Sequence, residues 1–156
     1  MNLQSGAINP DTLKGIETAK LLYAQFRKRP YDYKKVASNT GFSLEQCKIV
    51  KDYIFMNEHE LESGYKRFFA DLAMAHSWAR LSGNDRSKIL PEDILMMKHE
   101  LYEIDILLQR HDLKPIDAHH IAEQKFNYAL AIDRYYNSSG VKPVSYTHLT
   151  LPTTER

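Results

Sequence analysis

Apolar side chains recur every three or four residues through most of the chain, which is the spacing of one face of an α-helix. The clearest case is residues 91–110, whose apolar stripe consists of Ile94, Met97, Leu101, Ile104 and Leu108. Pro91 suits the first position of this helix, because a proline lacks only an N–H that has no helical partner there. Residues 111–115 end the helix, since the residue before a proline avoids the helical conformation. A second helix follows and runs to about Tyr136, so the pattern predicts a central antiparallel helix pair.

Two further helices are predicted over residues 9–29 and 71–81, and Trp78 is most simply an anchor of the core. Residues 57–69 lack helical spacing, and no segment shows the sustained alternation of apolar and polar residues that marks a strand. The sequence therefore predicts an all-α fold: a single compact domain of five to six helices over residues 1–140.

Residues 31–55 have the outline of a helix-turn-helix hairpin. Asp32 would cap a short helix, Gly41 would take the left-handed turn, and Ser43 with Gln46 would form the capping box of a longer helix. A DNA-reading helix needs exposed donors, and here Lys48 and its neighbours are interrupted by acidic residues. This favours plain helix packing over DNA binding.

The composition is that of an ordinary globular domain, with 43% hydrophobic and 26% charged residues in a chain of 156. The net charge of +1 disfavours a strongly electrostatic binder of nucleic acid or membranes. Cys47 has no second cysteine to pair with, and we expect it to be buried. No apolar run approaches the ~18 residues of a membrane span. We expect a soluble protein without a membrane partner.

Residues 141–156 differ in character from the rest of the chain. The stretch that begins at Val144, with the sequence VSYTHLTLPTTER, resembles a translated sequencing-library adapter. We therefore expect this tail to be non-native or disordered, and it is set aside for functional purposes.

The central helix pair carries the best candidate chemistry. His99 and Glu103 lie four residues apart, so their side chains meet on one helix face, and His119 and His120 lie at the start of the second helix. Two histidines, a carboxylate and a water form the ligand set of many catalytic zinc sites. In His-Glu-x-x-His hydrolases the first glutamate is the general base, a position that Glu100 takes here, while Glu103 replaces the second histidine. One interpretation is thus a divalent metal such as zinc, held by His99, Glu103 and His119 or His120.

A second interpretation is metal-independent cleavage of a phosphodiester. His99 and His119 would act as acid and base, and Arg67 would stabilise the developing negative charge. The supporting candidates are Glu100 as orienter and His59 and Tyr128 as walls of the site. A third interpretation has no catalysis, in which case the chain is a structural module or a helix-turn-helix DNA binder. The sequence leaves all three open.

Short motifs spread over residues 5–130 carry a resemblance to a known family. They are Ser5-Gly6-Ala7-Ile8, residues 36–42, Tyr53-Ile54-Phe55 with His59 and Leu61, Arg67-Phe68 with Asp71, Ser77-Trp78 with Arg80-Leu81, residues 98–101 with Glu103, and Ala118-His119 with Asn127-Tyr128. Together they resemble the C-terminal toxin-like effector domains of phage minor head (Mu F-like) proteins and bacterial polymorphic toxins. One departure is Phe69-Ala70, where the family usually has Asp-Pro.

The resemblance implies an effector domain carried by a larger phage or toxin protein, with an immunity protein as a further partner. It adds Lys98 and Asp71 to Tyr128 as candidate substrate-binding residues. Nucleases are common toxin cargoes, so by analogy the resemblance favours RNA or DNA as substrate. The expectation is a hydrolytic, toxin-like effector that is virion-associated or has a cytoplasmic target. A metal-dependent hydrolase and a non-catalytic phage module or DNA binder are the alternatives.

Overall fold

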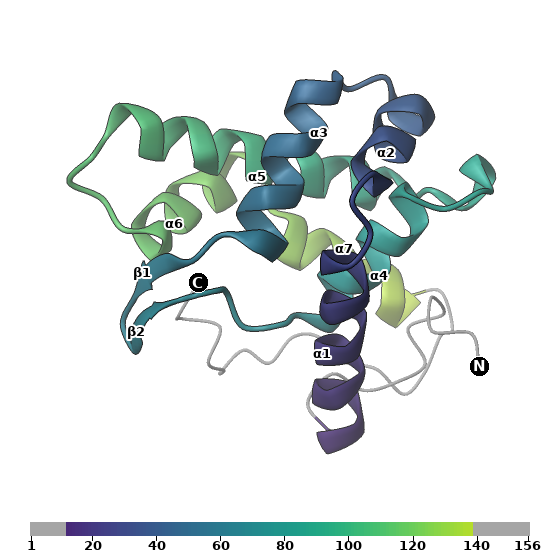
Figure 1. Ribbon diagram of the computed structural model, residues 1–156, viewed down its shortest axis with the longest axis horizontal. Helices are drawn as coiled ribbons and strands as arrows, with labels where there is room; N and C mark the ends of the chain where they lie inside the picture. The colour runs from purple at the N-terminus through teal and green to yellow at the C-terminus, as the bar shows by residue number, and fades with distance from the viewer. Residues whose placement is uncertain (1–11, 139–156) are drawn as a thin grey trace.

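The computed structural model describes residues 12–138. The Ser5-Gly6-Ala7-Ile8 motif and the tail over residues 141–156 lie outside the described residues. Within them the fold is mostly helical, as Figure 1 shows, and the predicted all-α class is confirmed. The α-helices are α1 (Leu13–Arg27), α2 (Asp32–Thr40), α3 (Leu44–Lys51), α4 (Leu72–Leu81), α5 (Pro91–Gln109), α6 (Pro115–Lys125) and α7 (Tyr128–Ser138). A π-helical turn, Asp52–Met56, extends α3, and a 3₁₀ turn, Arg86–Lys88, precedes α5.

The described residues thus form seven α-helices, against the five to six predicted. The difference comes from the last predicted helix, which breaks at residues 126–127 into α6 and α7. The predicted central pair is present: α6 turns back alongside α5 after a short connection, as Figure 1 shows. Pro91 and Pro115 each occupy the first turn of their helix, as the sequence indicated for Pro91.

The prediction that no strand is present was wrong. Strands β1 (His59–Leu61) and β2 (Gly64–Lys66) form an antiparallel hairpin in which His59 pairs with Lys66. Each strand has three residues, which is too short for the apolar–polar alternation that reveals a strand. Gly64 has φ 130°, a conformation that only glycine adopts readily, at the point where the chain enters β2.

The α2–α3 hairpin confirms the predicted left-handed turn at Gly41 and the capping box of Ser43 with Gln46. The role predicted for Asp32 was wrong, because Tyr31 is the cap of α2. Asp32 is buried instead, where it accepts hydrogen bonds from Lys51 and from Nε1 of Trp78. Lys51 is therefore inside the protein and does not offer its charge to DNA.

The core lies where α1, the π-helical turn and α4 meet. Trp78 is fully buried, as predicted, and its ring centroid lies 5.4 Å from that of Phe55. Phe55 in turn makes edge contacts with Tyr23 and Phe26 of α1. Cys47 is also buried, and burial raises the pKa of its thiol to about 11. These contacts join the first half of the chain to α4.

Helix α5 buries a polar face, which the sequence did not predict. Its buried residues are Asp93, Met96, Met97, His99, Glu100 and Glu103. The predicted apolar stripe is less buried than this face, and its last member, Leu108, is 67% exposed. The polar face is possible because its members have partners. At one end, Asp93 accepts two 2.8 Å hydrogen bonds from Arg80 of α4, which also donates to the hydroxyl of Tyr136 in α7.

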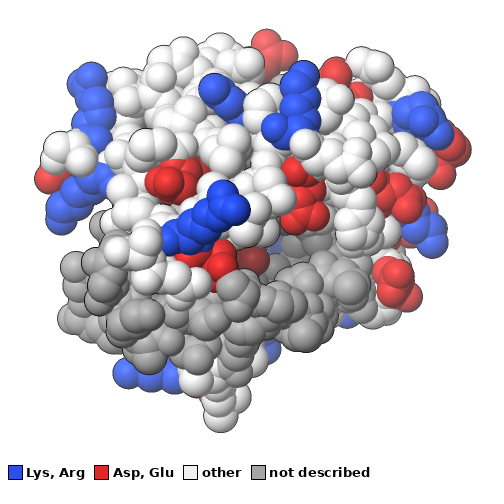
Figure 2. Space-filling model, turned by 180° about the vertical axis from the view of Figure 1, so that it is seen from behind, with Lys and Arg blue, Asp and Glu red and all other residues white. Residues whose placement is uncertain are grey.

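No helix among residues 12–138 combines the length and apolar character needed to cross a membrane. Figure 2 shows one face of the molecule, on which lysines and arginines are interspersed with acidic side chains rather than gathered into a basic patch. On this face the charge distribution agrees with the near-neutral composition.

Candidate metal centre

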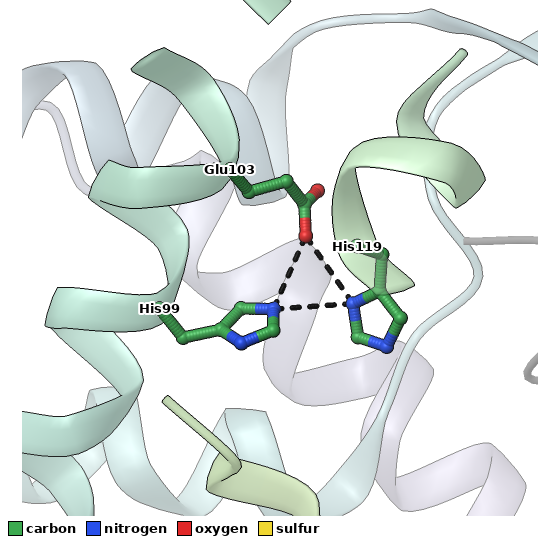
Figure 3. Close-up of side chains that lie close together, drawn as sticks. All are labelled: His99, Glu103 and His119. Carbon is green, nitrogen blue, oxygen red and sulfur yellow. Dashed lines mark hydrogen bonds and ion pairs between the residues drawn. The ribbon is translucent and has the colours of Figure 1, made fainter. Parts of the chain in front are cut away.

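Three side chains from α5 and α6 converge on one point, as Figure 3 shows. Nε2 of His99 lies 3.2 Å from Oε1 of Glu103 and 3.1 Å from Nδ1 of His119, and Nδ1 of His119 lies 3.2 Å from the same Oε1. The three atoms form a nearly equilateral triangle. Zinc bonds of about 2.0–2.2 Å to nitrogen and oxygen give a tetrahedron with edges of about 3.3 Å, so the triangle has the size of one tetrahedral face.

The helix period explains why these three residues meet. Four residues turn a helix by ~40° beyond one full turn, so Glu103 follows His99 on the same face. In α6 the small residues Ala118 and Ala122 are fully buried, and His119 lies beside this line. His120 is a further ~100° around the helix and is exposed. The phase of α6 therefore selects His119 over His120 for the centre.

Each histidine presents one particular nitrogen, and for His99 the reason is visible. Its Nδ1 lies 2.9 Å from the backbone carbonyl oxygen of Phe126, at the break between α6 and α7. That carbonyl can only accept, so Nδ1 carries the proton and donates it. In the neutral ring the lone pair is then on Nε2, which faces Glu103 and His119. A second hydrogen bond of this kind, which fixes the tautomer, is usual for histidine ligands of metals.

The carboxylate of Glu103 is divided between two partners. Oε1 belongs to the triangle, and Oε2 accepts a hydrogen bond from the hydroxyl of Tyr53 in the π-helical turn. The side chain of Glu103 is 0% exposed, and a carboxylate so fully removed from water needs compensating donors or a cation.

The surroundings of His99 favour positive charge at this point. Burial lowers the pKa of His99, but the hydrogen bond to Glu103 and the charges of Glu100 and Glu103 outweigh it, so that the pKa is raised. Glu100 is itself buried, at 1% exposure. Two buried carboxylates next to one imidazole make a place where a cation is stabilised.

Protons alone satisfy the triangle incompletely. With both imidazoles neutral, Nε2 of His99 and Oε1 of Glu103 are both acceptors, yet they lie 3.2 Å apart. A proton on Nε2 of His99 would form a hydrogen bond to Oε1 of Glu103, but one N–H points to only one acceptor at a time. A metal ion accepts electron pairs from all three atoms together, so the arrangement suits a divalent cation better than a single proton.

The centre is more accessible to solvent on the side of His119. The side chain of His119 is 20% exposed, whereas those of His99 and Glu103 are 3% and 0% exposed. A fourth ligand such as water would therefore reach the triangle past His119. Three protein ligands with one position left for water is the arrangement of catalytic zinc sites, while structural sites are closed by four protein ligands.

The other candidates from the sequence lie apart from the triangle. Arg67 is exposed, between β2 and α4, and lies near Arg27 of α1. This proximity is visible in the pKa of Arg27, which is lowered by burial and then by the positive charge of Arg67. His59 is buried, with its ring stacked on Phe68 at 4.0 Å and Nε2 2.8 Å from the carbonyl oxygen of Tyr53. It lies behind Tyr53 rather than in the centre.

Of the three candidate substrate-binding residues, Tyr128 and Asp71 lie near each other, since burial and then the charge of Asp71 raise the pKa of Tyr128. Tyr128 is buried and its hydroxyl lies 2.7 Å from Oγ of Ser77. Asp71 caps α4 by accepting from the backbone N–H of Met74, and Lys98 is exposed on α5. Within the described chain, these hydrogen bonds do not connect any of the three to His99.

Sequence reasoning missed the two outer partners of the centre. Tyr53 entered only as part of a motif, and no pattern tied it to Glu103, which is 50 residues away in the chain. The Phe126 carbonyl is backbone, so its role depends on the helix break and not on the side chain. Comparison of the chain with protein-family models, curated proteins and solved structures finds no match. The centre therefore rests on its own geometry.

Proposed function

We propose that this protein is a metal-dependent hydrolase whose divalent ion, zinc or a similar metal, is bound by His99, Glu103 and His119. The observation that carries the proposal is the triangle of Nε2, Oε1 and Nδ1, with edges of 3.1–3.2 Å. Its size, its two-histidine and one-carboxylate composition and its exposure on the His119 side all suit a catalytic zinc site.

Such a metal would supply a nucleophile, because it lowers the pKa of bound water to about 7. The chain would supply the base that takes the proton from this water. Glu100 is the candidate: it follows His99 directly, is buried, and lies close enough for its charge to raise the pKa of His99. On the helix it stands ~100° from His99 with Glu103 between them, the phase of the base in His-Glu-x-x-His hydrolases.

The metal-independent interpretation has less geometric support. An acid and a base that act on one phosphodiester need room for the phosphorus group between them. Nε2 of His99 and Nδ1 of His119 are 3.1 Å apart, which is hydrogen-bonding distance and leaves no such room. Arg67, the cation of that mechanism, lies near Arg27 instead. A nucleic-acid substrate remains compatible with a metal centre, and it stays the first substrate class to test.

The first experiment is the metal content and the zinc affinity of the purified protein, beside His119→Ala and His120→Ala. We expect one equivalent of metal in the wild type and in His120→Ala, and none in His119→Ala. The two substitutions remove the same chemical group from adjacent positions, so the pair separates a specific site from general binding by histidine. At 100 times the dissociation constant, zinc should stabilise the protein by about 2.7 kcal/mol. Equal metal content in the two variants would refute the centre.

The hydrolytic step is tested on protein loaded with metal. RNA, single- and double-stranded DNA and a denatured protein are offered as substrates, and wild type is compared with Glu100→Gln and Glu103→Gln. We expect Glu100→Gln to keep its metal and lose at least 100-fold in rate, as expected for a general base. Glu103→Gln should lose the metal itself. If the loaded wild type cleaves none of these substrates, the hydrolase proposal fails while the metal site can still stand.

A further inference from the structure

The segment that reaches the metal centre from outside the helix pair has an unusual backbone. Helix α3 ends at Lys51 and continues as a π-helical turn over Asp52–Met56, in which the N–H of Asn57 donates to the carbonyl of Asp52 at 2.8 Å. π-helical turns account for well under 1% of residues and occur frequently at functional sites. Tyr53 lies in this turn.

The phenol ring of Tyr53 is held by two neighbouring rings. It makes edge contacts with the rings of His59, at 4.8 Å, and Phe68, at 5.2 Å, and those two rings stack on each other. Nε2 of His59 also binds the carbonyl oxygen of Tyr53, which anchors the backbone at the same residue. All three residues are less than 10% exposed. The hydroxyl of Tyr53 is therefore held in place before any metal arrives.

That hydroxyl donates to Oε2 of Glu103, and Oε1 is the oxygen in the triangle. A carboxylate can bind a metal through one oxygen or through both. With Oε2 engaged by the phenol, Glu103 presents Oε1, the oxygen of the triangle, to the ion. Two nitrogens and one oxygen then leave the fourth tetrahedral position to water. If Glu103 bound through both oxygens, it would take up that coordination space.

We propose that Tyr53 is a positioning residue that keeps Glu103 monodentate and so preserves the open position of the metal; this inference rests on the proposed metal centre. The π-helical turn, His59 and Phe68 form the support that holds the phenol against the carboxylate. In this assignment His59, a catalytic candidate from the sequence, acts through Tyr53 and not on a substrate.

Cobalt(II) is the probe, because its visible absorption distinguishes four-coordinate from five-coordinate sites. Wild type, Tyr53→Phe and the control Tyr136→Phe are titrated with Co²⁺ at one pH. Tyr136 is a matched control, since it is fully buried and its hydroxyl accepts from Arg80 at 3.0 Å, away from the triangle. We expect Tyr53→Phe to bind 10–100-fold more weakly, the usual loss for an outer partner of a ligand. Its intense four-coordinate bands should weaken toward a five-coordinate spectrum.

Tyr136→Phe should match the wild type in both readouts. The inference is overturned if Tyr53→Phe keeps the wild-type spectrum and an affinity within twofold. If the wild type itself binds no Co²⁺, the metal centre fails, which is a separate result. Should Tyr53→Phe not fold, His59→Phe answers the question, because it keeps the ring stack and the Tyr53 hydroxyl but removes the anchor of Nε2. It should weaken binding in the same direction, and unchanged binding and spectrum would overturn the inference.

Discussion

His76 should make the stability of this protein fall steeply in mild acid. The side chain lies in α4, is 1% exposed, and has no hydrogen-bond partner at either ring nitrogen. Burial, and then the positive charge of Arg80 one turn later, lower the pKa of His76 to about 4. The imidazole is therefore neutral in the folded protein throughout the mildly acidic range. In the unfolded chain it titrates near 6.5.

The sign and size of the pH effect on stability follow from the pKa of His76 in the folded and unfolded states. Above pH ~6.5 both states are neutral at His76, and its contribution to stability is fully present. As the pH falls, His76 becomes protonated in the unfolded chain but stays neutral in the folded protein. The free energy of unfolding therefore decreases until pH ~4 and is then level. A difference of about 2.5 pKa units corresponds to roughly 3 kcal/mol in total. About 2 kcal/mol of this is lost between pH 7 and pH 5.

The assay is urea unfolding at several pH values from 7 to 4.5, for wild type, His76→Leu and His111→Leu. Leucine removes the titrating group and the two unpartnered nitrogens, so His76→Leu should lose about 2 kcal/mol less than wild type between pH 7 and pH 5. Other titrating groups, His99 among them, are common to both proteins and cancel in the difference. His111 is exposed and already meets water in the folded state, so His111→Leu should run parallel to wild type. Parallel curves for wild type and His76→Leu would refute the reasoning.

Three further substitutions and one thiol reagent test the fold. Asp93→Leu removes the Asp93 carboxylate from the buried guanidinium of Arg80 and should cost about 3–5 kcal/mol in urea unfolding. Asp112→Ala, which breaks an exposed ion pair, should leave the unfolding midpoint nearly unchanged. Ser43→Ala removes the cap of α3 and should cost about 1 kcal/mol, measured in the same way. Cys47 should react with a chromogenic disulfide only after unfolding, because it is fully buried and its thiol pKa is about 11; rapid reaction of the native protein would contradict its burial.

The sequence predicted the starts of α5 and α3 well, because a local signal marks each of them. Pro91 fixed the start of α5, and the capping box of Ser43 with Gln46 fixed the start of α3. These signals depend on backbone chemistry within a few residues, so they can be read without knowledge of the tertiary structure. The hairpin of β1 and β2 was missed because its pairing joins segments too short to carry a pattern.

The candidate centre could be predicted only in part. His99 and Glu103 share a helix, so their spacing brings them together whatever surrounds them. The choice between His119 and His120 depends on the rotation of α6 against α5, which tertiary packing sets. Tyr53 needed a π-helical turn, which has no reliable sequence signal. The inner face of α5 was misjudged for a related reason. Hydrophobic periodicity assigns the apolar side of a helix to the core and the polar side to solvent, so it cannot identify a carboxylate that is buried against a distant partner.

The polar inner face of α5 also determines how far this helix can move. Asp93 near its start is tied to Arg80 of α4, and Glu103, nearly three turns later, is tied to Tyr53 and the two histidines. Apolar helix faces tolerate some sliding, since one methyl group can replace another. A slip of one residue here would rotate α5 by ~100° and leave both carboxylates facing groups that cannot satisfy them. The helix therefore has a single acceptable register, set by the two buried carboxylates of Asp93 and Glu103.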